Sequence, residues 1–129
     1  MANQILLVMG AEVLGPPASI EKGLQVLRNY FREALKIKSG RIVEASGISR
    51  QNRITARAML TILQHYEPYH ELMRRQGRQF YKTGHLKGIR TRAGFLASTH
   101  GGFYRFVIII NTAGKTTDGI MQVIERHLK

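Results

Sequence analysis

Apolar residues recur at helical spacing through the first half of the chain. Asn3 is predicted to cap a first short helix, which ends at Gly15-Pro16-Pro17 because proline cannot continue the hydrogen-bond ladder. A second helix follows and ends at Ser39-Gly40. Residues three or four positions apart form its buried face, namely Ile20, Leu24, Leu27, Phe31 and Leu35.

A third helix is predicted after a polar loop. Residues 41–45 form a short extended segment, and a stretch rich in Ser and Gly follows it. Thr55 is expected to cap the third helix, whose inward residues are Ala58, Met59, Ile62 and Leu63. Pro68 interrupts this helix, and a short helical segment is predicted from Tyr69 to Arg75.

From Gln79 onward the apolar pattern changes from helical to extended. Three strands are predicted, at residues 79–85, 88–98 and 102–111, and their short connections favour antiparallel hairpins. The apolar run Phe106 to Ile110 is typical of a central strand that is covered on both faces.

A last helix completes the predicted fold. Asp118 is expected to cap it, and its buried stripe is predicted to contain Ile120, Val123, Ile124 and Leu128. The pattern therefore predicts an α+β fold over residues 1–129, a single domain in which helices flank an antiparallel three-stranded sheet.

Composition adds a strong positive charge to this picture. The 129 residues include 20 Lys and Arg against 8 Asp and Glu, so the formal net charge is +12. The absence of Cys excludes a disulfide scaffold and a Cys-ligated zinc site. The apolar run Ile5 to Met9 is far shorter than the roughly 18 residues of a membrane span, and no signal peptide surrounds it.

The positive charge implies an anionic partner, which could be nucleic acid, anionic lipid or an acidic cell-wall polymer. The segment from Leu72 to Arg92 is the most basic and contains no acidic residue. A solvated face is the ordinary interpretation of such a segment. Aromatic residues do not alternate with its arginines as a nucleic-acid stacking surface requires, so nucleic acid is disfavoured.

Lys82-Thr83-Gly84 is the sharpest short motif, at the end of a strand and just before a turn. Gly would leave the strand edge open to a substrate backbone, and Lys and Thr would present a cation and a hydroxyl to a carboxylate. An ordinary strand end, in which Gly begins the turn, explains the same residues equally well.

The polar loop Ser46 to Asn52 is the second candidate. Its hydroxyls and amides suit substrate positioning and proton transfer, and they suit turns and helix caps as well.

Together these motifs resemble the C-terminal part of the penicillin-binding protein 4 type D-alanyl-D-alanine carboxypeptidase/endopeptidases, peptidase family S13. Residues 44–54, Glu-Ala-Ser-Gly-Ile-Ser-Arg-Gln-Asn-Arg-Ile, are similar to that family's Asp-Gly-Ser-Gly-Leu-Ser-Arg-x-Asn loop. Residues 82–88, Lys-Thr-Gly-His-Leu-Lys-Gly, and the following 93–96, Ala-Gly-Phe-Leu, are similar to its Lys-Thr-Gly strand and the strand after it. The resemblance covers most of the chain and is strongest over residues 41–111.

The resemblance implies a transpeptidase/β-lactamase-like fold and a serine-type D-Ala-D-Ala carboxypeptidase that cleaves peptidoglycan stem peptides and reacts with β-lactams. It implies that Ser49 relays protons, that Asn52 orients the substrate amide, and that Lys82 and Thr83 hold the terminal carboxylate. Gly84 and His85 complete the implied substrate site.

The sequence departs from the family pattern within the implied site. The spacing of the family's Ser-x-Asn element would place Gln51 in the role given to Asn52. Glu44-Ala45 replaces Asp-Gly, and His85 replaces a hydroxyl residue.

The nucleophile of this chemistry requires Ser-x-x-Lys, which occurs here only as Ser19-Ile20-Glu21-Lys22. Because Ser19 follows two prolines and suits a helix N-cap, the chain is expected to be the C-terminal portion of a longer enzyme, or a degenerate stand-alone copy, and to be inactive alone. Two strands of the family sheet would then be missing. The open sheet edge is expected to be covered by the missing segment, a partner chain or a homodimer contact.

The family's location implies a periplasmic or extracellular protein. No cofactor and no metal site are predicted. The alternative function is a non-catalytic basic module that binds cell-wall peptide or nucleic acid.

Overall fold

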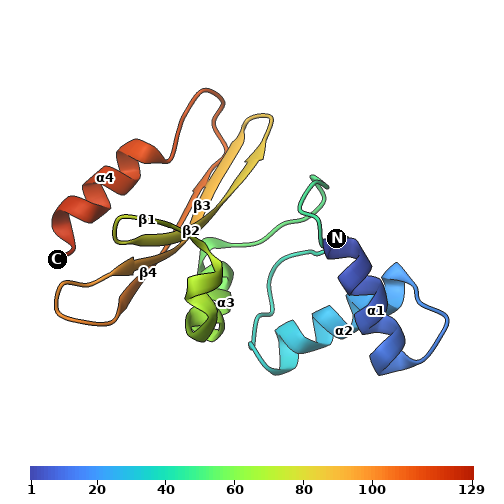
Figure 1. The fold of residues 1–129 in the computed structure, drawn as a ribbon. Helices are drawn as coiled ribbons and strands as arrows, with labels where there is room; N and C mark the ends of the chain where they lie inside the picture. The colour runs from blue at the N-terminus through green and yellow to red at the C-terminus, as the bar shows by residue number, and fades with distance from the viewer. The chain divides into compact units, whose positions relative to one another are not determined.

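The computed structural model describes all residues 1–129, which form two compact units, Met1–Ala58 and Met59–Lys129 (Figure 1). A single domain over residues 1–129 stays a prediction. The elements along the chain are α1 (Ala2–Leu14), α2 (Ile20–Glu33), α3 (Ala56–Tyr66), the 3₁₀ helix η1 (Glu67–Leu72), β1 (Arg74–Gln76), β2 (Gln79–Leu86), β3 (Ile89–Ala97), β4 (Phe103–Ile110) and α4 (Asp118–His127). None of the helices is long and apolar enough to span a membrane.

Helices α1 and α2 pack closely in the first unit because small residues meet at their contact. Leu6 and Gly10 of α1 are buried, as are Gly23 and Leu24 of α2. A Cβ atom on Gly10 would lie only 2.5 Å from the backbone nitrogen of Gly23. The absent side chains therefore set the separation of the two helices.

Asn3 does not cap α1, contrary to the prediction. The N-cap is Met1, and no side chain caps this helix. The Asn3 side chain instead accepts a hydrogen bond from the Ala45 amide at 2.8 Å, a contact between residues far apart in sequence.

Helix α2 begins as predicted and ends early. Ser19 is its N-cap, and its hydroxyl oxygen accepts a hydrogen bond from the Lys22 amide at 3.2 Å, which confirms that role. The helix ends at Glu33 and not at Ser39-Gly40, and Lys36 has a positive φ of 56° that an α-helix cannot contain. The predicted extended segment 41–45 is reduced to one antiparallel bridge between Arg41 and Arg53.

Helix α3 matches its predicted start. The Ala58 amide donates to the Thr55 hydroxyl oxygen at 3.1 Å, so the predicted cap is confirmed. The helix ends at Tyr66, and Pro68 lies in the first turn of η1.

The sheet of the second unit has four antiparallel strands in the order β1-β2-β3-β4, whereas three were predicted. The additional strand β1 contains Arg74 and Arg75, which were predicted to end a helical segment. Gly77 permits the turn into β2 because its φ is +57°. β1 pairs with β2 only from Gln79 to Tyr81.

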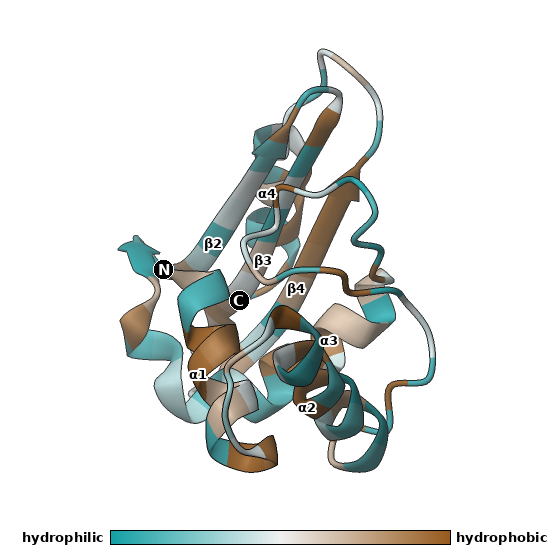
Figure 2. Cartoon of the chain, turned by 90° about the vertical axis from the view of Figure 1, so that its right-hand side faces the viewer, coloured by the Kyte–Doolittle hydropathy of each residue, from teal (hydrophilic) through white to brown (hydrophobic).

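Strand β4 is an edge strand of this sheet, so its prediction as the central strand was wrong. The interior strands are β2 and β3, and Phe95 and Leu96 of β3 are fully buried. β4 is nevertheless apolar along most of its length, as its brown colour in Figure 2 shows. Its outer edge has no strand partner in the structure.

Helix α4 packs on one face of the sheet through Met121, which is 1% exposed against Tyr81, Leu96, Phe106 and Ile108. Ile124 and Leu128 flank this core as predicted, whereas Ile120 and Val123 are exposed. The predicted stripe was therefore out of phase, because it omitted Met121. The N-cap is Thr117, without a side-chain hydrogen bond, and Asp118 is the first helical residue.

Two arginines of the basic segment tie α4 to the sheet. The Arg78 guanidinium donates to the carbonyls of Ala97, Glu125 and Leu128 at 3.1, 3.3 and 2.7 Å, and so satisfies carbonyls in the last turn of α4. Arg92 forms an ion pair with Asp118 at the start of α4, at 3.1 Å. Both cations therefore serve the fold.

The close approach of α1 and α2 predicts that Gly23→Ala destabilises the first unit. The new Cβ would lie 2.7 Å from Cγ of Leu6, and this overpacking should lower the free energy of unfolding by roughly 1–3 kcal/mol. Urea unfolding followed by circular dichroism measures the change. Gly119→Ala in α4 is the control, because its Cβ meets no atom within 4 Å and the variant should be stabilised by about 0.5–1 kcal/mol. An unchanged urea midpoint for Gly23→Ala would contradict the packing argument.

Candidate active site

The loop that contains Ser49 and Asn52 belongs to the first unit and is closed at its base by two backbone hydrogen bonds. The Arg41 amide donates to the Arg53 carbonyl at 2.8 Å, and the Arg53 amide donates back at 2.7 Å. Asn52 lies just inside this bridge. Its Oδ1 accepts from the Val43 amide at 2.8 Å, and its Nδ2 donates to the Glu44 carbonyl and carboxylate at 3.2 and 2.5 Å. The Asn52 side chain therefore fastens the two ends of the loop together.

Glu44 is the centre of the loop. Its carboxylate accepts hydrogen bonds from the Ser46 hydroxyl, from the Ser46 amide at 2.6 Å and from the Ser49 amide at 3.1 Å. The Ser46 hydroxyl is the largest cause that lowers the pKa of Glu44 to about 2, and the two backbone amides and Asn52 act in the same direction against partial burial. An ionised carboxylate thus organises the segment where the family pattern has Asp-Gly.

Ser49 and Gln51 are oriented by the same loop. The half-buried Ser49 accepts a hydrogen bond at its hydroxyl oxygen from the Gln51 amide at 3.2 Å, and its carbonyl accepts from the Asn52 amide at 3.1 Å. The Ser49 hydroxyl proton has no acceptor within the structure, so it is available for transfer. The exposed Gln51 side chain accepts from Arg41 at 3.4 Å and keeps its amide nitrogen free.

Asn3 is a positioning residue that the sequence analysis missed. Its carboxamide oxygen holds the Ala45 amide, next to Glu44, and its amide nitrogen has no partner. An Asn near the start of a helix is also the usual signal for a cap. The contact with a loop more than forty residues away could not be distinguished from a cap by sequence alone.

Lys82 to His85 lie in the second unit, on an exposed part of β2. β1 covers the outer edge of β2 only as far as Tyr81, so the edge from Lys82 onward has no strand partner. Alternation along the strand places Lys82 and Gly84 on one face and Thr83 and His85 on the other. A ligand that lies in the plane of the sheet, beside the edge, could reach residues of both faces.

Gly84 and His85 have different surroundings. A Cβ on Gly84 would lie 2.5 Å from the hydroxyl oxygen of its cross-strand neighbour Thr91, so a larger residue here would force the Thr91 side chain to move. His85 is opposite Arg90 and helps to line a small cavity of about 210 Å³ with Lys87 and Lys115. The basic residues around this cavity suit an anion. A hydroxyl residue at position 85, as in the family pattern, would not add to that basic character.

Ser19 and Lys22 do not form a nucleophile and base pair. The Lys22 side-chain amine donates to the carbonyls of Gly15 and Pro17 at 2.6 and 3.0 Å, and not to the Ser19 hydroxyl. The Ser19 hydroxyl accepts the Lys22 backbone amide as an N-cap. The proton of this hydroxyl therefore has no base positioned to take it.

Comparison with known proteins identifies a family for the part of the chain that contains the Ser49 loop, and the matched residues end before Lys82. A family model described as the D-Ala-D-Ala carboxypeptidase 3 (S13) family matches residues 1–75. No curated protein sequence matches significantly.

Two crystal structures of penicillin-binding protein 4 from Haemophilus influenzae have the same fold. The first, a complex with a β-lactam, superposes with a TM-score of 0.78 at 20% identity and covers 99% of this chain. The second gives 0.75 at 22% identity over 88% of this chain. The chain spans only 38% and 31% of the length of those two proteins.

The hydrogen bonds to Glu44 predict a pH dependence of stability. The folded-state pKa of about 2 lies below the ordinary value of 4.5, so the stabilisation is present above pH 4.5 and is lost as the pH falls toward 2. The stability difference between the unsubstituted chain and Glu44→Gln should therefore shrink over that range in urea titrations. Glu12→Gln, which removes an exposed carboxylate of α1, is the control. A difference that stays constant from pH 5 to pH 2 would contradict the role of Glu44.

Proposed function

The chain belongs to the D-Ala-D-Ala carboxypeptidase 3 (S13) family, and on that premise we propose that it supplies part of a serine-type D-Ala-D-Ala carboxypeptidase acting on peptidoglycan stem peptides. The observation that carries the proposal is the exposed edge of β2 from Lys82 to His85, which β1 leaves uncovered. Peptidoglycan as substrate would require a protein in the periplasm or outside the cell.

The edge of β2 suits a peptide that adds as an extra antiparallel strand. Main-chain hydrogen bonds to the edge would supply affinity, and the Lys82 ammonium and Thr83 hydroxyl would bind the terminal carboxylate. Gly84 keeps the edge free of a side chain where the peptide backbone passes, and His85 extends the site.

The Ser49 loop would act on the scissile amide. We assign proton transfer to the leaving group to Ser49, whose hydroxyl proton is free, and orientation of the substrate amide to Asn52. The Nδ2 group of Asn52 donates to Glu44, and its Oδ1 accepts one hydrogen bond from the Val43 amide. The second lone pair of Oδ1 therefore remains for a substrate. Gln51 keeps its whole amide nitrogen available and is the alternative for this role.

The acyl-transfer step needs a serine nucleophile with an adjacent base, and the Ser19 and Lys22 contacts provide none. We therefore propose that the chain alone is inactive. The outer edge of apolar β4 would be covered by another segment of the enzyme, by a partner chain or by a second copy.

Fluorescent penicillin tests the nucleophile assignment directly. The 129-residue chain should carry no label on any serine after incubation, because Lys22 is engaged with backbone carbonyls. Peptide mass mapping identifies any labelled residue, and a complete S13 enzyme serves as the positive control. Label on Ser19 would make this chain a minimal enzyme and would contradict the proposed inactivity.

Lys82→Ala tests the substrate edge. Loss of a charge-assisted contact should weaken binding of diacetyl-Lys-D-Ala-D-Ala about tenfold, measured by calorimetry or by NMR shifts of the β2 amides. Arg126→Ala, which removes an exposed cation of α4, should leave binding within about twofold. Equal affinities for the two variants would remove Lys82 from the carboxylate site.

A non-catalytic binding module is the second candidate, and the local engagement of Ser19 and Lys22 favours it. Such a module would bind the same peptide without acylation. A module that binds nucleic acid would instead bind DNA with an affinity that falls steeply as the salt concentration rises, and Lys82→Ala would not change that affinity. The use of Arg78 and Arg92 within the fold leaves fewer cations for such binding.

A further inference from the structure

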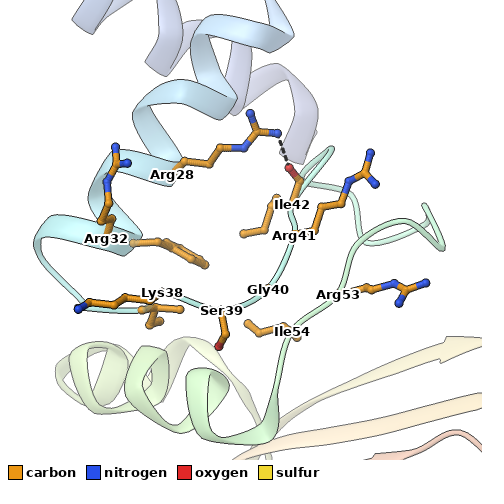
Figure 3. A pocket seen from close by; sticks show the side chains of 11 residues that line it. Arg28, Arg32, Lys38, Ser39, Gly40, Arg41, Ile42, Arg53 and Ile54 are labelled. Carbon is orange, nitrogen blue, oxygen red and sulfur yellow. Dashed lines mark hydrogen bonds between the residues drawn. The ribbon is translucent and has the colours of Figure 1, made fainter.

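The first unit contains a cavity that the proposed peptide site does not use. It measures about 350 Å³ and lies between α2, the segment that follows α2, and the residues just before α3 (Figure 3). Its apolar lining consists of Phe31, Ile37, Ile42 and Ile54. A hollow of this size is at the lower end of the range for small-ligand pockets, and its apolar wall suits an aliphatic or aromatic group.

Cations surround this apolar wall and no carboxylate lines it. The basic residues are Arg28, Arg32, Lys38, Arg41 and Arg53. Figure 3 shows Arg32 and Lys38 on one side of the hollow and Arg41 and Arg53 on the other. The charged ends of Lys38, Arg41 and Arg53 point outward in this view, so these cations lie at the rim of the hollow and come from more than one segment of the chain.

These cations have not been neutralised by the protein. Arg28 donates to the Ile42 carbonyl at 2.8 Å, Arg32 to the Asn29 side chain at 2.8 Å and Arg41 to the Gln51 side chain at 3.4 Å. All three acceptors are neutral oxygens, and each guanidinium keeps further N–H donors. The Lys38 ammonium and the Arg53 guanidinium form no hydrogen bond and no ion pair in the structure, although the Arg53 backbone pairs with Arg41.

The mutual repulsion of these like charges is a cost that an anionic ligand would remove. Cations that served only for solubility would be expected over a polar surface, whereas here they surround an apolar hollow. Arginine presents a planar set of donors that matches the oxygens of a phosphate or carboxylate group.

We propose that this cavity binds a small amphipathic anion, in which a phosphate or carboxylate head contacts the surrounding cations and an aliphatic or aromatic group fills the hollow. Arg53 and Lys38 are the head-group residues with no competing partner, and Phe31 and Ile54 contact the apolar group. The cavity is lined only by residues of the first unit, whereas Lys82 belongs to the second unit.

Calorimetry on the 129-residue chain with hexyl phosphate, hexanoate, inorganic phosphate and hexanol tests the proposal. The two amphipathic anions should bind more tightly than either inorganic phosphate or hexanol, because only they satisfy both parts of the site. A tighter hexyl phosphate identifies a phosphate head, and a tighter hexanoate identifies a carboxylate. Increasing the salt concentration from about 0.01 to 1 M shortens the Debye length from about 30 to 3 Å and should weaken binding severalfold.

Arg53→Gln and Lys38→Gln should each weaken the binding of hexyl phosphate by about three- to tenfold. Lys36→Gln is the matched control, since it removes one exposed cation of the same unit outside the cavity, and its affinity should change less than twofold. Circular dichroism verifies that each variant is folded. Binding of hexanol as tight as that of hexyl phosphate, or equal affinities of all three variants, would overturn the proposal, as would no detectable binding of either amphipathic anion.

Discussion

The buried guanidinium of Arg92 is the interaction on which the second unit depends most. It is 6% exposed, donates to Gln79 of β2 at 2.5 Å and to Asp118 of α4 at 3.1 Å, and stacks 3.9 Å above the Tyr81 ring. Its buried Nε has no hydrogen-bond partner, which carries a desolvation penalty. The same side chain nevertheless joins β2, β3 and α4 at one point. Two of its contacts, Gln79 and Tyr81, lie in β2 just before Lys82, which links the packing of α4 to the position of the candidate substrate edge.

The first unit depends on a carboxylate in a comparable way. Glu44 collects donors from Ser46, Ser49 and Asn52, so the loop keeps its shape without a hydrophobic core of its own. The polar groups of the candidate site in this loop are therefore held by other polar groups. A loop built in this way is sensitive to the charge of Glu44, whereas the β2 edge is held by sheet hydrogen bonds and is not.

Local chemistry determined which features could be predicted from the sequence. The Ser19 and Thr55 caps and the hairpins formed by β2, β3 and β4 depend on neighbouring residues and were predicted correctly. The predictions were wrong where contacts between distant residues determine the structure. Asn3 accepts a hydrogen bond from Ala45 and does not cap α1, and Met121 is the residue of α4 that packs deepest against the sheet. The candidate site follows the same rule, because its motif residues were visible in sequence while the role of Glu44 depends on how the loop closes.

The short length of β1 has a consequence for the direction and end of any peptide bound beside it. β1 occupies the edge of β2 up to Tyr81, so an added strand would have room only from Lys82 onward. A peptide running antiparallel to β2 would have its C-terminus at the Lys82 end, against β1. Steric exclusion would then reject chains that continue beyond this point. Selection for a free C-terminal residue would thus come from the backbone, in addition to the charge of Lys82.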